Sequence, residues 1–140
     1  MKIFLDANIL FSASFPNSLL ASFLSNLKEL AELISSVYAT AEAERNLQAK
    51  MPNCLATFKE LEKSLKMISF QIFDLEVPLA SKDQPILCAA IAAKADFLLT
   101  GDKKDFGHLF GKTVRGVKIV TVSLLVEELQ RFGFLEILPM

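Results

Sequence analysis

Short apolar segments alternate along the chain with longer segments whose apolar residues recur every three or four positions. The short segments are typical of strands and comprise residues 2–5, 36–40, 96–100 and 118–122, with 68–75 as a further candidate. The longer segments have helical spacing and comprise residues 18–33, 41–50, 84–95 and 123–132, with one more helix opened by Pro52. We therefore expect strands and helices to alternate through the whole chain.

This alternation predicts an α/β fold. Strands linked by helices run parallel, and the helices cover both faces of the sheet. We expect a single three-layer domain over residues 1–140, with a parallel sheet of four to five strands. In such folds ligands bind where the carboxyl ends of the strands meet, which we call the carboxyl edge of the sheet.

Two carboxylates follow predicted strands at this edge. Asp6 comes directly after the first strand, and Asp102 comes after the strand at 96–100, separated from it by one glycine. A charge directly after a buried strand is uncommon without a partner, so Asp6 is difficult to explain as an ordinary surface residue. Both side chains are therefore expected at the carboxyl edge, despite their distance in the sequence.

Other acids approach the same edge from the starts of predicted helices. Asp83 directly precedes the helix at 84–95, whereas Glu42 and Glu44 lie in the first turn of the helix at 41–50. Asp105 is expected at the rim. Each of these acids also has a simpler interpretation, because Asp83 can serve as an N-cap, first-turn glutamates complement the helix dipole, and Gly-Asp is a turn signal.

Clustered carboxylates repel one another unless protons or a cation neutralise them. Carboxylate oxygens suit Mg²⁺ or Mn²⁺, and neither a cysteine pair nor a histidine pair favours zinc. A metal held in this way can activate water and neutralise a phosphodiester. The single histidine, His108, has no acid or serine triad around it, and neither a dinucleotide fingerprint nor a P-loop motif is present.

Composition narrows the class of protein further. Hydrophobic residues make up 52% of the chain and the net charge is −1, so no strong basic footprint marks a nucleic-acid-binding protein. Cys54 and Cys88 lack metal-like spacing and are expected to be reduced thiols of a cytoplasmic protein. Asp6 and Asn8 interrupt the first apolar stretch before a signal peptide can form, and no segment is long enough to span a membrane.

Four segments together resemble a known family. "FLDANIL", "TAEAERNL", "KDQPILCAAIAAKADFLLTGDKKDF" and "VKIVTV" are similar, in this order, to the successive motifs of PIN-domain proteins, which include VapC-like toxins. The resemblance implies a PIN-like fold and an Mg²⁺- or Mn²⁺-dependent ribonuclease that cleaves RNA with metal-activated water. It also implies the toxin of a toxin–antitoxin pair, with an antitoxin protein as partner and a homodimer as the expected assembly.

The resemblance assigns roles to individual residues. The four acids of the family fall on Asp6, Glu42, Asp83 and Asp102, which would be catalytic and, together with Asp105, would bind the metal. Asn8 and Thr100 match polar residues that support the acids. Helical periodicity does not decide between Glu42 and Glu44, but the family pattern favours Glu42.

The remaining charge fits an RNA substrate. Without the five acids of the expected site, 11 acidic residues stand against 15 basic ones, a net charge of +4. Lysines gather around the last motifs, and those expected to contact an RNA backbone are Lys82, Lys103 and Lys104.

Two other functions fit parts of the sequence. A haloacid dehalogenase-like phosphohydrolase would use Asp6 as a nucleophile and a second aspartate two residues later, where this chain has Asn8. A non-catalytic PIN-like module that binds RNA or protein would gain nothing from burying repulsive charge. RNA cleavage with and without Mn²⁺, beside a phosphatase assay, separates the three functions.

Overall fold

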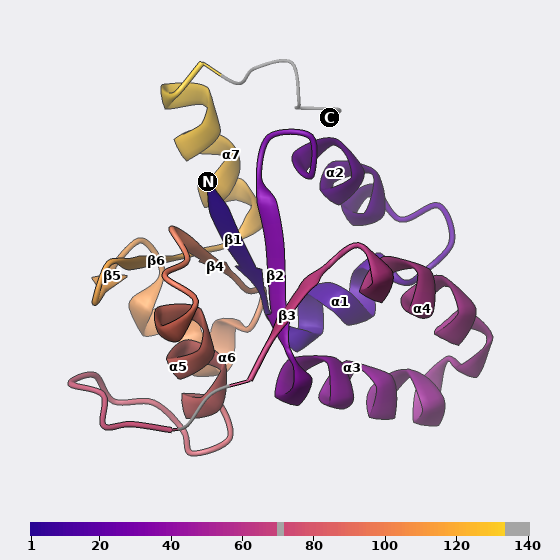
Figure 1. Cartoon of the computed structure of the whole chain (residues 1–140), viewed down its shortest axis with the longest axis horizontal. Coiled ribbons are helices and arrows are strands. Elements are labelled where there is room, and N and C mark those ends of the chain that lie inside the picture. Colours follow the sequence, from indigo (N-terminus) through magenta and orange to yellow (C-terminus); the bar gives the residue numbers. More distant parts are fainter. Residues whose placement is uncertain (70–71, 134–140) are drawn as a thin grey trace.

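The computed structural model describes residues 1–69 and 72–133 and contains a six-stranded sheet (Figure 1). The strands lie in the order β3-β2-β1-β4-β6-β5. Their bounds are β1 Lys2–Leu5, β2 Glu32–Ser36, β3 Lys66–Ile68, β4 Phe97–Leu99, β5 Thr113–Val114 and β6 Val117–Val120. All pairs are parallel except β5 with β6. The predicted parallel sheet is therefore confirmed, but it has six strands where four to five were expected, because the two-residue β5 adds a short antiparallel edge.

Helices follow most of the strands directly. Their bounds are α1 Ala7–Ala13, α2 Leu19–Leu27, α3 Val37–Lys50, α4 Leu55–Lys63, α5 Gln84–Ala92, α6 Lys103–Phe106 and α7 Val122–Arg131, with short 3₁₀ helices η1 at Pro52–Cys54 and η2 at Gly107–Leu109. Side-chain oxygens cap several of these helices at their N-termini by accepting a backbone N–H; the capping residues include Asp6, Ser18, Ser36 and Thr121.

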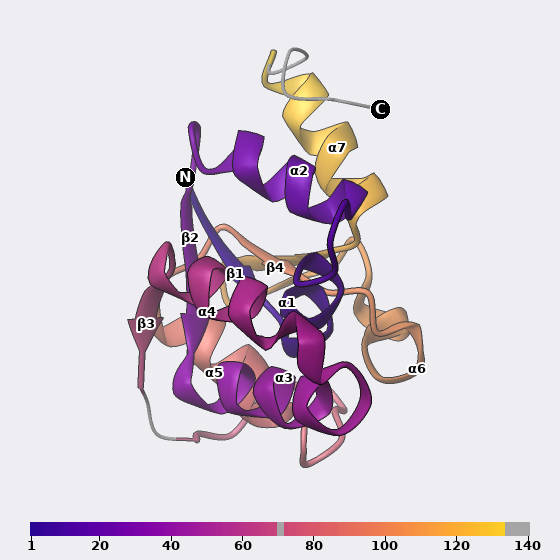
Figure 2. The same cartoon turned by 90° about the vertical axis from the view of Figure 1, so that its right-hand side faces the viewer.

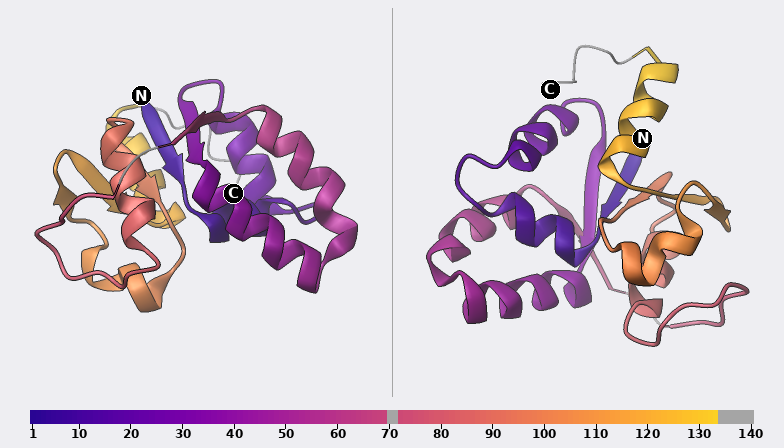
Figure 3. Two further views of the ribbon diagram at one scale, coloured as in Figure 1. Left: turned by 60° about the horizontal axis from the view of Figure 1, so that its bottom comes forward. Right: turned by 180° about the vertical axis from the view of Figure 1, so that it is seen from behind.

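Alternate strand residues pack on opposite faces of the sheet, as the strand period requires. Ile3, Leu5 and Leu99 face a core formed with α1, α2, α4 and α7, whereas Phe4 and Leu98 face a second core under α5 and η2. The two helical layers lie on either side of the strands (Figures 1 and 3). The predicted three-layer arrangement is thus observed.

The predicted strand at 36–40 is wrong. β2 ends at Ser36 and α3 begins at Val37. The hydroxyl of Ser36 accepts a hydrogen bond from the amide of Ala39 (3.1 Å), and the hydroxyl of Thr40 donates to the Ser36 carbonyl (3.0 Å). These local bonds start a helix where β-branched and aromatic residues had indicated a strand.

Other predicted boundaries also shift. α2 ends at Leu27, not near residue 33, because the residues that prolong its apolar pattern, Leu30 and Ala31, pack against the same core on the way into β2. The strand predicted at 68–75 is replaced by β3 at Lys66–Ile68, and residues 70 and 71 lie outside the described residues. α1 and α6 were not predicted, because each has only one or two turns.

The carboxyl edge of the sheet lies at one end of the molecule. In Figure 2 α2 and α7 lie at the end where the strands begin, and α3 and α5 lie toward the end where the strands stop. The strand order changes direction between β1 and β4, which is where open parallel sheets bind ligands. Within the described ranges, no helix is both long and apolar enough to cross a membrane.

Candidate metal centre

Asp6 and Thr100 meet where the two central strands end. Leu5 of β1 pairs with Leu99 of β4, and the amide of Asp6 donates to the Leu99 carbonyl at 3.1 Å. The register therefore places Asp6 beside Thr100, whose hydroxyl donates to Asp6 Oδ2 at 2.7 Å. Both side chains are buried. The pairing of neighbouring strands thus brings together two residues that lie 94 positions apart.

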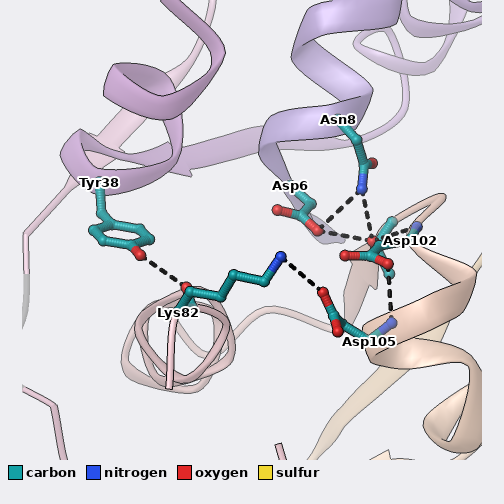
Figure 4. A network of polar contacts seen from close by, with 7 residues as sticks. Asp6, Asn8, Tyr38, Lys82, Asp102 and Asp105 are labelled. Carbon is teal, nitrogen blue, oxygen red and sulfur yellow. Dashed lines mark hydrogen bonds and ion pairs between the residues drawn. The ribbon is translucent and has the colours of Figure 1, made fainter. Parts of the chain in front are cut away.

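Asn8 joins this contact to the loop after β4 (Figure 4). Its amide nitrogen lies 3.5 Å from Asp6 Oδ2 and 3.4 Å from the Thr100 hydroxyl, and its amide oxygen accepts the amide of Gly101 at 3.0 Å. The Thr100 hydroxyl also accepts the amide of Asp102 at 3.1 Å. Asn8 and Thr100 therefore fix Asp6 relative to the loop that carries Asp102.

Three other carboxylates form an acidic cluster, Asp83, Asp102 and Asp105. One carboxylate oxygen from each lies within 4.8 Å of the other two. Asp102 caps α6, because its Oδ1 accepts the amide of Asp105 at 2.9 Å. Close carboxylate oxygens on a rigid backbone are the donor set that Mg²⁺ or Mn²⁺ prefers, so these residues fit a divalent cation.

Asp83 is the most constrained member of the acidic cluster. It is 8% exposed, its side chain does not cap α5, and Oδ2 is buried with no hydrogen-bond partner among residues 1–69 and 72–133. The simpler interpretation of Asp83 as a capping residue is therefore wrong. Burial is the main cause that raises the pKa of Asp83 to about 7, and the charge of Asp105 is the second. A buried, unpartnered carboxylate oxygen beside two other acids is a ligand that a divalent cation would satisfy.

Asp6 borders the acidic cluster. Burial raises the pKa of Asp6 to about 6, against the hydrogen bonds from Thr100 and Ala7, and the charges of Glu42 and Asp102 raise it further. Glu42 and Asp102 therefore lie close enough to Asp6 to act on its ionisation. This edge of the sheet concentrates negative charge on buried and partly buried side chains, and a bound cation would reduce the repulsion between them.

Two solved structures have a similar fold. A chain of VapBC2 from Rickettsia felis, in a crystal structure with a DNA fragment from the promoter, aligns with a TM-score of 0.66 at 20% identity, covering 86% of this chain and 98% of that chain. A chain of VapBC-1 from nontypeable Haemophilus influenzae aligns with a TM-score of 0.54 at 17% identity, covering 76% and 91%. This chain has a PIN-like fold. No protein-family model and no curated protein matches its sequence.

The two candidate glutamates, Glu42 and Glu44, both lie on α3 but have different neighbours. Glu44 pairs with Lys59 of α4 at 2.7 Å. The charge of Glu42, by contrast, raises the pKa of Asp6, although its effect is smaller than those of burial and the hydrogen bonds. The two side chains thus leave α3 in different directions, and Glu42 is the one near the acids. The sequence had indicated that both glutamates lie in the first turn of the helix. This is wrong, because α3 begins at Val37, several residues earlier.

The lysines expected to contact RNA differ in their surroundings. The Lys82 ammonium lies 3.0 Å from Asp105 Oδ2, and this contact lowers the pKa of Asp105. Lys103 and Lys104 are exposed on α6 beside the acidic cluster. The ammonium of Lys82 therefore partly neutralises the acidic cluster, and Lys103 and Lys104 add positive charge nearby.

Two side chains near the site were missed or set aside at the sequence level. The Tyr38 hydroxyl donates to the Lys82 carbonyl at 2.8 Å, and a ring nitrogen of His108 lies 2.7 Å from the Pro78 carbonyl. Tyr38 was counted within the predicted strand at 36–40, so its place in the first turn of α3 was not foreseen. Ser36 was the one signal in the sequence, because serine is favoured at helix N-caps, but Ala39 stands where a capping box would have Glu or Gln.

Proposed function

We propose that this chain is an Mg²⁺- or Mn²⁺-dependent ribonuclease that hydrolyses phosphodiester bonds of RNA. The observation that carries the proposal is the buried, unpartnered Oδ2 of Asp83 beside Asp102 and Asp105. Asp83, Asp102 and Asp105 would hold the cation, and Asp6 and Glu42 would complete the acidic surroundings. Such a cation lowers the pKa of a water molecule and neutralises a phosphodiester.

The residues of the chain would divide the remaining work. Asn8 and Thr100 keep Asp6 and Asp102 in fixed positions, so the acids need no rearrangement when substrate binds. Lys82, Lys103 and Lys104 supply positive charge for an RNA backbone that would otherwise be repelled by the acids.

We infer further that the chain is the toxin of a toxin–antitoxin pair and binds an antitoxin protein. The support is the PIN-like fold that it shares with VapBC2 and VapBC-1, at 20% and 17% identity. A homodimer in the cytoplasm stays a prediction.

The two other functions are less well supported. The amide of Asn8 is engaged by Thr100 and Gly101 and has no proton-transfer capacity, so it cannot replace the second aspartate of a haloacid dehalogenase-like phosphatase. A non-catalytic module would not need Asp83 buried without a partner.

A cleavage assay tests the proposal. We expect single-stranded RNA to be cut in Mn²⁺, to survive in EDTA, and to be cut at least about 100-fold more slowly by the Asp83→Asn variant. The matched control is Asp74→Asn, which changes an exposed aspartate and should cleave normally. Cleavage that resists EDTA, or full activity of Asp83→Asn, would overturn the proposal, and turnover of a phosphomonoester in place of RNA would favour the phosphatase.

A further inference from the structure

Tyr38 connects α3 to the segment that carries two charged residues of the site. It is the only tyrosine of the chain, is 36% exposed, and lies in the first turn of α3. Its hydroxyl donates to the backbone carbonyl of Lys82 at 2.8 Å, as Figure 4 shows. This bond spans 44 residues and joins the first turn of α3 to the segment directly before α5.

The accepting carbonyl belongs to the peptide unit between Lys82 and Asp83. The amide of Asp83, at the other end of the same planar unit, donates to the Ala80 carbonyl at 2.9 Å. A trans peptide is rigid, so two hydrogen bonds at its opposite ends set the orientation of the whole plane. Without the Tyr38 hydroxyl, the local bond to Ala80 would be the one that remains on this peptide among the described residues.

The two charged side chains are attached at the two ends of this peptide. On one side the ammonium of Lys82 reaches to 3.0 Å from Asp105 Oδ2. On the other side Asp83 places its unpartnered oxygen within the acidic cluster, without help from a cap or any side-chain donor on Oδ2. The backbone therefore contributes to the placement of Asp83, because no donor among the described residues holds Oδ2.

The Tyr38 hydroxyl is suited to this task. A tyrosine hydroxyl is protonated at neutral pH and can donate, and burial, followed by the charges of Glu42 and Asp83, raises the pKa of Tyr38 further. The helix that carries Tyr38 is itself fixed, because Ser36 both ends β2 and caps α3.

We propose that Tyr38 is a positioning residue of the metal site, whose hydroxyl holds the Lys82–Asp83 peptide so that Asp83 faces Asp102 and Asp105. This inference rests on the metal site of the proposed function.

The test is a calorimetric titration of Mn²⁺ into the full chain and into Tyr38→Phe, which keeps the ring and removes the hydroxyl. The matched control is Ser64→Ala, which removes another hydroxyl that donates to a backbone carbonyl, at 2.7 Å, at the end of α4. We expect Tyr38→Phe to bind Mn²⁺ about tenfold more weakly, as when other groups that orient metal ligands are removed, and Ser64→Ala to bind normally. RNA cleavage by Tyr38→Phe should recover when the Mn²⁺ concentration is raised by the same factor.

The outcomes separate the two proposals. Equal Mn²⁺ affinity in Tyr38→Phe and the unaltered chain would overturn the role of Tyr38 and leave the proposed function intact. The same loss in Ser64→Ala would also overturn it, because the effect would then be general. Failure of the unaltered chain to bind Mn²⁺ would overturn the metal site itself, and with it this inference.

Discussion

Asp83 is buried, and Oδ2 of its carboxylate has no donor, so its ionisation should govern the stability of the metal-free protein. Burial, and then the charge of Asp105, raise the pKa of Asp83 to about 7 in the folded state, above the ordinary value of 3.8. The folded protein thus binds more protons than the unfolded chain between these values, and the free energy of unfolding falls as pH rises through them. Asp6, whose pKa burial raises to about 6, acts in the same direction.

We therefore predict that the melting temperature in EDTA falls between pH 5 and pH 8. The Lys82 contact lowers the pKa of Asp105, so Asp105 loses its stabilising effect only in more acidic solution and does not obscure this window. Asp83→Asn should melt at a higher temperature than the unaltered chain at pH 8, and the difference should shrink towards pH 4. Calorimetry measures this. A melting temperature of the unaltered chain that stays constant between pH 5 and pH 8 would contradict the raised pKa values of Asp83 and Asp6.

Thr100 makes the hydrogen bonds that tie Asp6 to the loop after β4. Its buried hydroxyl donates to Asp6 Oδ2 and accepts the amide of Asp102. Thr100→Val keeps the shape but removes both bonds, so we expect it to lower the free energy of unfolding by about 1–3 kcal/mol. Thr100→Ser keeps the hydroxyl and should lose clearly less. Urea denaturation compares the two, and equal losses would mean that the missing contact is the methyl group and not the hydroxyl.

At the scale of elements, α3 carries the two glutamates in different directions. Glu44 is held by Lys59 on the side of α4, and Glu42 acts electrostatically on Asp6. We predict that Glu42→Gln slows Mn²⁺-dependent RNA cleavage about tenfold or more, whereas Glu44→Gln changes it little, because an exposed ion pair contributes little. Initial cleavage rates at a fixed Mn²⁺ concentration measure this. The opposite ranking would mean that Glu44, not Glu42, serves the site.

The elements also explain which predictions from the sequence succeeded. β1, β4 and α5 were predicted because each is a continuous apolar segment with a clear boundary at Asp6, Thr100 or Pro85. β2 and the start of α3 were misplaced, because Val37 and Tyr38 have strand propensity while the hydroxyl of Ser36 supplies a helix cap. Local capping prevailed over propensity, and the apolar period alone does not contain that information.

At the scale of the molecule, the convergence of the acids followed from topology. Residues after parallel strands meet at one edge, so Asp6 and Asp102 could be expected together from the sequence, and Asp83 could be expected near them. The register that joins Asp6 to Thr100, the unpartnered oxygen of Asp83 and the contact of Lys82 with Asp105 could not be predicted, because each depends on packing between distant segments.

The most direct test of the metal site is the effect of Mn²⁺ on thermal unfolding. A ligand at ~100 times its dissociation constant adds about 2.7 kcal/mol to the free energy of unfolding, which raises the melting temperature of a domain of this size by several degrees. We predict this increase at pH 7.5, a smaller one at pH 4.5, where protons compete for the carboxylates, and none in Asp83→Asn. No increase at pH 7.5 in saturating Mn²⁺, or an equal increase in Asp83→Asn, would contradict a metal site built from Asp83, Asp102 and Asp105.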